Sequence, residues 1–394
     1  GLIKGKLEEH HLLRSTKLVE VDAGQTIKLG KFSVEFIRSC HSIPDSVMLA
    51  ITTTAGTILH TGDFKIDYTP IDGKPMDLGR IAELGNKGIL ALMSDSTNSE
   101  RKGFTMSEKS VGAVFDKLFM NCKKRIVVAT FASNVHRVQQ IVDSAVKYDR
   151  KIAVCGRSMI NMIENARALG YIDAPEDIFI DIDLIRNYND EQLVIITTGS
   201  QGETMSALTR MAAGEHKKVT ITPNDLVIIS ANAIPGNEKL VSKVIDDLMK
   251  IGAEVVYSSL ADVHVSGHAC QEEQKLILSL ARPQYFIPVH GEYRQLMAHA
   301  ETAKELGLVD ELGGIDKALD IAVAKAGIEG YTVVSYPEKQ DFLSSLLDTK
   351  PTNYVESQLL KSKLGEYYQQ FGLLKNLQEQ SMIQARIPFE LNIK

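Results

Sequence analysis

The sequence predicts an α/β protein in which a β-rich segment precedes a parallel sheet covered by helices on both faces. Two patterns support this fold class. Short β-rich runs separated by turns occupy residues 30–95, and apolar strands alternating with amphipathic helices follow from about residue 105. The length of 394 residues allows two or three domains, and 44% hydrophobic and 24% charged residues are ordinary globular values.

The β-rich segment is expected to form four short strands joined by tight turns. Its apolar and β-branched runs are bounded by Gly, Pro and Asp residues, as is typical of strands. Ala55-Gly56 indicates a hairpin turn between the second and third strands. The predicted strands cover residues 32–37, 47–53, 57–60 and 89–93.

The middle of the chain repeats a strand, a polar loop and an amphipathic helix several times. Thr105-Met106-Ser107-Glu108 matches a capping box, after which apolar residues recur at helical spacing from Val111 to Leu118. Continuous apolar strands between such helices indicate a parallel sheet buried on both faces. The predicted strands are 126–130, 152–155, 193–197, 226–230 and 255–258, and two further helices are expected over 135–145 and 240–248.

Composition narrows the possible functions. The net charge of −6 argues against a polycation that coats nucleic acid, so any nucleic-acid binding must be local. No run of eighteen apolar residues occurs and the start lacks a signal-peptide pattern, so we expect no membrane partner and no secretion. The four cysteines are widely separated, which favours reduced thiols and a cytoplasmic location.

Three polar residues at predicted strand ends have the chemistry of a metal site. His41 follows the first strand, Asp63 follows the strand that ends at residue 60, and His290 ends an apolar run over 285–289. Imidazole and carboxylate are donors that zinc prefers, and one carboxylate can bridge two ions. Each signal taken singly also fits a structural histidine or an ordinary turn.

A second group of strand-end loops has residues suited to binding phosphate. Glycines, hydroxyls and imidazoles stand where apolar strands give way to polar loops, which in α/β sheets is where sites form. The alternative is that all of these loops are helix caps and tight turns. The candidates are Ser133 and His136, Ser200 in Thr197-Thr198-Gly199-Ser200-Gln201-Gly202, the loop 230–238, and Ser266 and His268 in His264-Val265-Ser266-Gly267-His268.

These strings resemble ribonuclease J, a family in the β-CASP branch of the metallo-β-lactamase superfamily, over residues 1 to about 300. The resemblance implies a metallo-β-lactamase αββα sandwich, incomplete here, with an inserted β-CASP domain. His41 and His290 then match zinc ligands and Asp63 the bridging carboxylate, which is also catalytic. Asp95 in Ser94-Asp95-Ser96-Thr97-Asn98, His136 and His268 match the three β-CASP motifs, with His268 facing the phosphate to be cut.

The resemblance also implies what the protein acts on. Members cleave RNA as 5′-to-3′ exonucleases and endonucleases, prefer a 5′-monophosphate, use two Zn²⁺ ions and form homodimers or homotetramers. Ser133, His136, Ser200, Ser266 and Asp95 would line the RNA path. Basic residues near these loops could contact RNA phosphates, or could be ordinary solvated charges: Arg101, Lys102, Arg137 and Arg157.

The main ligand motif of the superfamily, H-x-H-x-D-H, does not occur in the 394 residues. We therefore expect a chain truncated at its N-terminus relative to the family, with impaired cleavage, because two protein ligands per ion fall short of a normal zinc site. The expected domains are a first metallo-β-lactamase part (1–95), a β-CASP domain (96–260), a return segment (261–302) and a tail (303–394). The alternative from the binding class is an RNA-binding remnant without catalysis.

The tail has a different character. A helix over 318–326, a strand over 331–336 and long polar helices to about residue 384 are expected, giving a mainly helical segment. From about residue 303 the chain is similar to the C-terminal part of the signal peptide peptidase A family of serine proteases. A third interpretation is therefore a serine-protease assembly segment, although no nucleophile with an activating base is identifiable.

Overall fold

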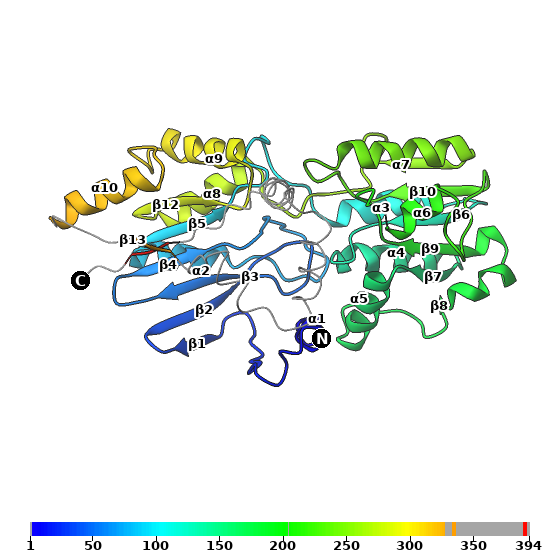
Figure 1. The fold of residues 1–394 in the computed structure, drawn as a ribbon, viewed down its shortest axis with the longest axis horizontal. Helices are drawn as coiled ribbons and strands as arrows, with labels where there is room; N and C mark the ends of the chain where they lie inside the picture. Colours follow the sequence, from blue (N-terminus) through cyan, green and yellow to red (C-terminus); the bar gives the residue numbers. More distant parts are fainter. Residues whose placement is uncertain (1, 204, 328–332, 336–388, 392–394) are drawn as a thin grey trace, which may run out of the picture. The chain divides into compact units, whose positions relative to one another are not determined.

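The structure is a computed structural model that describes residues 2–203, 205–327, 333–335 and 389–391. The chain divides into two compact units, Gly1–Asp310 and Glu311–Lys394. The first unit begins with helix α1 (Leu2–Glu9) and contains two six-stranded sheets, as the elements of Figure 1 show. Mixed α/β structure was predicted from the sequence, and the structure confirms it.

The first sheet has the strand order β1-β2-β3-β4-β5-β12. Its strands pair antiparallel from β1 to β4, while β5 lies parallel to both β4 and β12. The four predicted strands are present, and backbone hydrogen bonds between Thr53 and Gly56 close the predicted hairpin. The strands are β1 (Thr26–Leu29), β2 (Phe32–Arg38), β3 (Val47–Thr52), β4 (Thr57–His60), β5 (Ala91–Asp95) and β12 (Tyr285–Val289).

Helices cover one face of this sheet. The helices α2 (Leu78–Lys87), α8 (Gln271–Ala281) and α9 (Tyr293–Glu305) contribute Ile81, Ile277 and Ala303 to a core shared with the strands. Ala303 is fully buried, so the domain boundary expected near residue 303 falls inside α9. The compact unit continues to Asp310.

The second sheet is parallel throughout, in the order β11-β10-β6-β9-β7-β8. Every strand pairs parallel because each helix returns the chain to the same edge, as the alternating pattern predicted. The whole sheet lies in sequence between β5 and β12, which pair with each other, so it is an insertion in the first domain. The strands are β6 (Arg125–Ala129), β7 (Lys151–Cys155), β8 (Phe179–Ile180), β9 (Leu193–Thr197), β10 (Asp225–Ile229) and β11 (Glu254–Tyr257).

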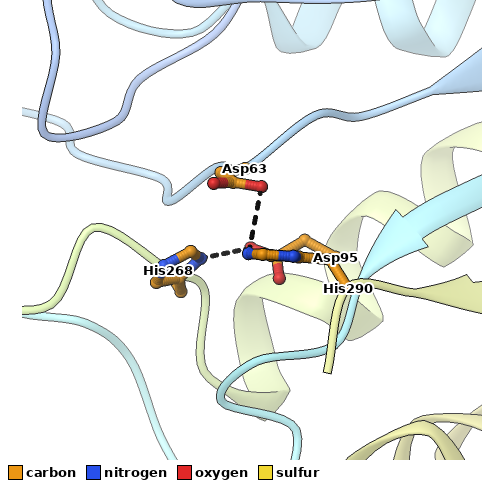
Figure 2. Close-up of side chains that lie close together, drawn as sticks. All are labelled: Asp63, Asp95, His268 and His290. Atoms are coloured by element: carbon orange, nitrogen blue, oxygen red, sulfur yellow. Dashed lines mark hydrogen bonds and ion pairs between the residues drawn. The ribbon is translucent and has the colours of Figure 1, made fainter. Parts of the chain in front are cut away.

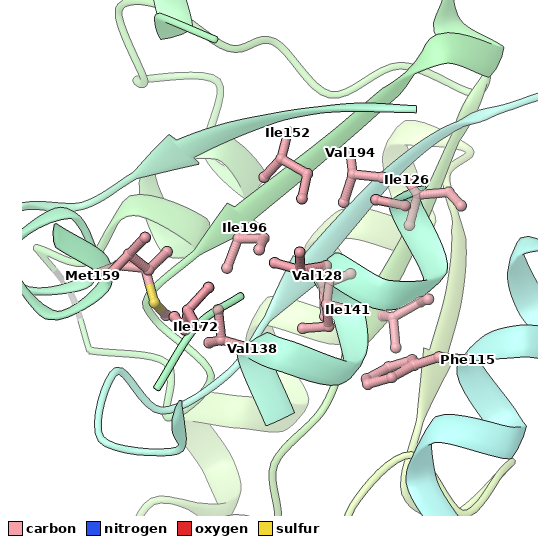
Figure 3. Packing of buried hydrophobic residues seen from close by; sticks show 14 of the residues in the cluster. Phe115, Ile126, Val128, Val138, Ile141, Ile152, Met159, Ile172, Val194 and Ile196 are labelled. Atoms are coloured by element: carbon pink, nitrogen blue, oxygen red, sulfur yellow. The ribbon is translucent and has the colours of Figure 1, made fainter. Parts of the chain in front are cut away.

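Both faces of the parallel sheet are buried, as expected. Ile126 and Val128 of β6 pack with α3, α4 and α5, whereas Val127 and Ala129 pack with α6 and α7. Figure 3 shows the first of these cores, with Phe115 and Ile141 against the strand residues. The helices are α3 (Lys109–Phe119), α4 (Val135–Lys147), α5 (Arg157–Ala168), α6 (Ala207–Ala212) and α7 (Glu238–Ile251), with 3₁₀ turns at Ile182–Asn187 and Asp190–Gln192.

The capping box expected at Thr105 is wrong. Helix α3 starts at Lys109, and its cap residue Glu108 makes no side-chain capping bond. Thr105 donates its hydroxyl to the His268 carbonyl at 2.8 Å and its amide to Glu273 at 2.7 Å. These tertiary hydrogen bonds hold the segment away from helical geometry, and the Glu108 carboxylate binds Arg137 instead.

The second unit contains α10 (Ile315–Ala326) and the antiparallel pair of β13 (Val333–Ser335) with β14 (Phe389–Leu391). The predicted helix over 318–326 and the strand near 331–336 are therefore confirmed where they are described. The polar helices expected to about residue 384 lie outside the described residues. In the described part of the chain, every helix is too short or too polar to span a bilayer. The four cysteines are free thiols.

Candidate metal centre

His41, Asp63 and His290 meet at one edge of the first sheet. Strands β2, β4 and β12 run in the same direction, because β2 and β4 flank the antiparallel β3 and β12 is parallel to β5. The residues that follow these strands therefore emerge at the same edge. His41 Nε2 lies 3.8 Å from Asp63 Oδ2, and His290 Nε2 lies 3.4 Å from Asp63 Oδ1. The Asp63 carboxylate thus presents one oxygen to each imidazole.

A backbone carbonyl fixes the orientation of His41. Its Nδ1 lies 2.8 Å from the Gly267 oxygen, which can only accept, so Nδ1 carries the proton and Nε2 is left with a lone pair. A Cβ at Gly267 would lie 2.6 Å from His41 Cε1 and 2.7 Å from its Nδ1, so any larger residue would displace the imidazole. Burial lowers the pKa of His41 below its ordinary value, which favours the neutral ligand form.

His290 reaches the cluster from a strained backbone. Its φ of 53° lies in the left-handed region, which is uncommon for a residue with a side chain. Such a conformation at the end of β12 is typical of positions where the fold imposes a side-chain direction. The imidazole points at Asp63 as Figure 2 shows, and it is 55% exposed.

The donor set fits zinc. Two imidazoles and a bridging carboxylate are ligands that zinc prefers, and the carbonyl behind His41 is the support that ligating histidines usually have. These three residues are therefore candidates for holding zinc. Four donors at mutual distances within 4.8 Å, from Asp63, Asp95, His268 and His290, also form a group that could hold an ion.

Hydrogen bonding separates Asp95 from the ligands in this group. Asp95 Oδ2 accepts from His268 Nδ1 at 2.7 Å, and Oδ1 accepts from the amide and hydroxyl of Thr97 at 3.0 and 2.7 Å. The carboxylate is 1% exposed and its acceptor sites are largely occupied by these donors. Asp95 therefore orients His268 and is poorly placed to bind a metal ion.

The His268–Asp95 pair favours a charged imidazole. Burial opposes the charge, but the hydrogen bond to Asp95 and the charges of Asp95 and Asp63 raise the pKa of His268 above its ordinary value. Burial would likewise raise the pKa of Asp95, yet His268 and Thr97 lower it. The His268 ring lies between His41 and His290, with centroids 5.0 and 5.5 Å away. An imidazole held in place by Asp95 therefore stands beside the candidate ion site.

Ser266 is close to the His268–Asp95 pair, but its hydrogen bonds stabilise the loop that carries His268. Its hydroxyl accepts from Asn98 Nδ2 at 2.9 Å and from the His268 amide at 3.1 Å. Asn98 also donates to the His268 carbonyl at 2.8 Å. These bonds connect the segment after β5 with the His268 loop, so the geometry supports a structural part for Ser266 beside its predicted contact with substrate.

The predicted residues of the parallel sheet lie at its strand ends. Ser133 is exposed before α4, and Ser200 is buried in the loop after β9. His136 lines a narrow pocket together with His41 and Lys65, so one β-CASP histidine shares a surface with the metal centre. Burial lowers the pKa of His136.

The prediction that Arg137 contacts RNA or is an ordinary solvated charge is wrong. It is fully buried and donates to Glu108, at 2.8 Å from Nε and 2.7 Å from Nη2. Arg101, Lys102 and Arg157 are exposed, so they remain available to a ligand. The predicted helix over 135–145 placed residue 137 in its first turn, and helical periodicity could not show its buried partner.

Sequence reasoning missed the polar residues of α8. Glu273 and Gln274 are buried, and they bind backbone groups next to Asp63, Asp95 and His268. The available signal was an acid in the first helical turn, which is common at helix N-termini for other reasons.

The fold and the site together define a class. A metallo-β-lactamase-type domain, an inserted parallel β-CASP sheet and a His/Asp cluster at strand ends are the features of a metal-dependent hydrolase. Residues 123–248 match the family described as "Ribonuclease J, beta-CASP domain", and residues 252–313 match the "Zn-dependent metallo-hydrolase RNA specificity domain". Over these residues the chain is similar to the ribonuclease J family.

Several curated ribonucleases are similar to this chain over a longer stretch. Ribonuclease J of Helicobacter pylori (strain ATCC 700392 / 26695) is 51% identical over 312 residues, 79% of this chain and 45% of that protein. Ribonuclease J of Synechocystis sp. is 50% identical over 312 residues, 79% of this chain and 49% of that protein. Ribonuclease J2 of Bacillus subtilis (strain 168) is 44% identical over 308 residues, 78% of this chain and 55% of that protein. The chain spans about half the length of the curated relatives it matches.

A solved structure shares the fold. The crystal structure of a protein of unknown function from Enterococcus faecalis V583 aligns with a TM-score of 0.50 and 17% identity, over 71% of this chain and 63% of that one. At this identity the likeness concerns the fold alone.

Proposed function

We propose that this chain carries the hydrolytic centre of a zinc-dependent RNA hydrolase of the ribonuclease J type, with 5′-to-3′ exonuclease and endonuclease action. The observation that carries the proposal is the convergence of His41, Asp63 and His290 beside the His268–Asp95 pair. Five separate segments of the sequence contribute to this cluster, as they would for a built site and as chance surface residues rarely do.

The three ligand candidates would hold two Zn²⁺ ions, with Asp63 between them. When bound, such ions polarise a phosphate and lower the pKa of water. The contribution of the chain is to keep His41 in its ligating tautomer through Gly267 and to aim His290 from its left-handed backbone. Asp63 is therefore proposed as both ligand and catalytic carboxylate.

His268 is proposed to hold the scissile phosphate. A protonated imidazole gives a charge-assisted hydrogen bond to a phosphate oxygen, and Asp95 keeps its other nitrogen engaged. The strand-end loops with Ser133, His136 and Ser200, together with Ser266, would line the RNA path, with a preference for a 5′-monophosphate. The exposed Arg101, Lys102 and Arg157 supply positive charge near these loops.

One observation favours a second candidate, an RNA-binding remnant without catalysis. The chain contains no H-x-H-x-D-H string, so the centre provides two protein donors per ion where zinc usually takes three or four. In this case cleavage would be impaired while the loops that bind phosphate remain intact.

Metal analysis and RNA cleavage distinguish the two candidates. The purified full chain is assayed for zinc by mass spectrometry and incubated with RNA carrying a 5′-monophosphate or a 5′-triphosphate. Zinc at about two ions per chain with faster digestion of the monophosphate RNA supports the hydrolase. RNA retention that weakens as salt rises, without zinc and without digestion, supports the remnant. A chain that neither retains nor cleaves RNA refutes both.

We also propose a cytoplasmic protein that forms homodimers or homotetramers. The dispersed free cysteines fit a reducing compartment. The likeness of the tail to the signal peptide peptidase A family, and the serine-protease interpretation that follows from it, remain predictions from the sequence. Size-exclusion chromatography with light scattering tests the assembly directly.

A further inference from the structure

We propose that Glu273 is a positioning residue. It fixes the loop after β4, which carries Asp63, against the loop before α8, which carries His268. The inference rests on the proposed function, because it assigns Asp63 and His268 their parts. Glu273 stands in the first turn of α8 and its side chain is fully buried. Because Glu273 is 0% exposed, its effect on the site would act through the backbone groups that it binds.

The Glu273 carboxylate accepts hydrogen bonds from three separate chain segments. Oε1 accepts from the Ile66 amide at 2.7 Å. Oε2 accepts from the Thr105 amide at 2.7 Å and from the Cys270 amide at 2.8 Å. Amides from residues 66, 105 and 270 thus meet at one side chain, although only the last is its neighbour in sequence.

Each of these amides adjoins a site residue. Ile66 lies three positions after Asp63, and Cys270 lies two positions after His268. Thr105 belongs to the segment that leads into the inserted domain, and its hydroxyl donates to the His268 carbonyl at 2.8 Å. One carboxylate therefore fixes the loop of the bridging ligand against the loop of the phosphate-binding histidine.

The surrounding backbone extends this clamp. The Phe64 amide points to Asp95 Oδ2 at 3.5 Å, and the Lys65 amide donates to the Cys40 carbonyl at 2.8 Å, next to His41. The Ala269 amide donates to the Phe64 carbonyl at 2.6 Å. Successive amides after Asp63 are thus fixed by three partners, and two of them, Asp95 and Glu273, also hold the His268 side.

Only a carboxylate suits this position. Three N–H donors require both oxygens as acceptors, and an amide side chain has one acceptor oxygen and one donor nitrogen. In Glu273→Gln the side chain keeps its shape, but in either orientation an NH₂ group faces at least one backbone N–H. A buried donor left without an acceptor is unfavourable, so one of the two loops should loosen.

The test compares Glu273→Gln with Asp225→Asn in the full chain. Asp225 is also a buried carboxylate that accepts a backbone amide, from Thr222 at 2.7 Å, and it pairs with Arg125 at the opposite end of the β-CASP strands. Zinc alone is titrated against a chromogenic chelator, and amide hydrogen exchange is followed in peptides covering residues 64–67, 104–106 and 269–271. Thermal stability is measured for both variants.

We expect Glu273→Gln to weaken zinc binding by about 10- to 100-fold and to speed exchange in the three peptides. Asp225→Asn should lose a comparable amount of thermal stability while changing zinc affinity by less than about twofold. Equal effects of the two variants on zinc and on exchange would overturn the proposal, and so would a Glu273→Gln variant that behaves as wild type. A wild-type chain without zinc binding would count against the proposed function, and the exchange data would still decide the role of Glu273.

A milder variant covers the case in which Glu273→Gln does not fold. Thr105→Val removes the hydroxyl donated to the His268 carbonyl and leaves the amide donated to Glu273. Exchange should rise in the 269–271 peptide alone, with zinc affinity within about twofold of wild type. Faster exchange around residues 64–67, or no change in any peptide, would contradict the inference that Glu273 and the Thr105 hydroxyl hold these loops through separate hydrogen bonds.

Discussion

Replacing Arg137 by Met should destabilise the protein by about 3–5 kcal/mol, the usual cost of removing one partner from a buried ion pair. The Arg137 guanidinium is fully buried, and two of its donors bind both oxygens of Glu108. Others reach the Ser230 carbonyl at 3.0 Å and the Val265 carbonyl at 3.2 Å, and Nη1 lies 2.7 Å from His264 Nδ1.

The magnitude follows from what the substitution leaves behind. Met occupies similar volume, so the cavity is small, but it donates no hydrogen bond. Glu108 then keeps a buried charge with Gln140 Nε2 at 3.4 Å as a weak donor. The Ser230 and Val265 carbonyls each lose a hydrogen-bond donor, which costs at most roughly 1 kcal/mol per carbonyl. Part of this cost is already included in the cost of breaking the ion pair.

Urea unfolding measures the change. The chain has 12 tyrosines and no tryptophan, so far-UV circular dichroism and tyrosine fluorescence are the appropriate probes. The shift of the transition midpoint at constant m-value gives the free-energy difference. The double variant Arg137→Met with Glu108→Leu should recover about 2 kcal/mol or more, because the orphaned charge is gone.

Two results would refute this reasoning. The first is a loss below about 1 kcal/mol for Arg137→Met, which would mean that water or a rearranged partner satisfies Glu108. The second is a double variant no more stable than the single one, which would mean that packing rather than charge pairing sets the cost.

Three further predictions concern the site and its surroundings. His268→Ala should lower any RNA cleavage by about 100-fold or more while costing less stability than Arg137→Met, because Thr97 still donates two hydrogen bonds to Asp95; comparable losses in a kinetic and a urea assay would indicate a structural histidine. Asp63→Asn should reduce bound zinc from about two ions to one or none per chain, measured by mass spectrometry, whereas unchanged zinc would remove Asp63 from the ligand set. Burial lowers the pKa of His299 to about 4, so the unfolded chain binds more protons between pH 6.5 and 4. His299 should therefore cost about 2 kcal/mol of stability as pH falls from 6.5 to 5, a slope that His299→Gln should reduce in urea titrations; an unchanged slope would assign it to other groups such as His264.

Local patterns in the sequence predicted the central strands of the parallel sheet. The apolar runs of β6, β7, β9 and β10 predicted strands to within one residue at each end, because strands buried on both faces must be continuously apolar. The Thr105 capping box failed because its donors and acceptors found tertiary partners in Glu273 and His268. A four-residue pattern contains no information about such partners.

Residue types and their positions at strand ends predicted the α/β class and the candidates His41, Asp63 and His290, while longer strings carried the resemblance to the ribonuclease J family. Only the tertiary structure decided which of them meet and in what state. The parallel alignment of β2, β4, β5 and β12 brings distant strand ends to one edge, and Asp95 proves to orient His268. The roles of Arg137 and Glu273 likewise follow from their burial, because a buried charge must be paired with the donors or acceptors that the fold places around it.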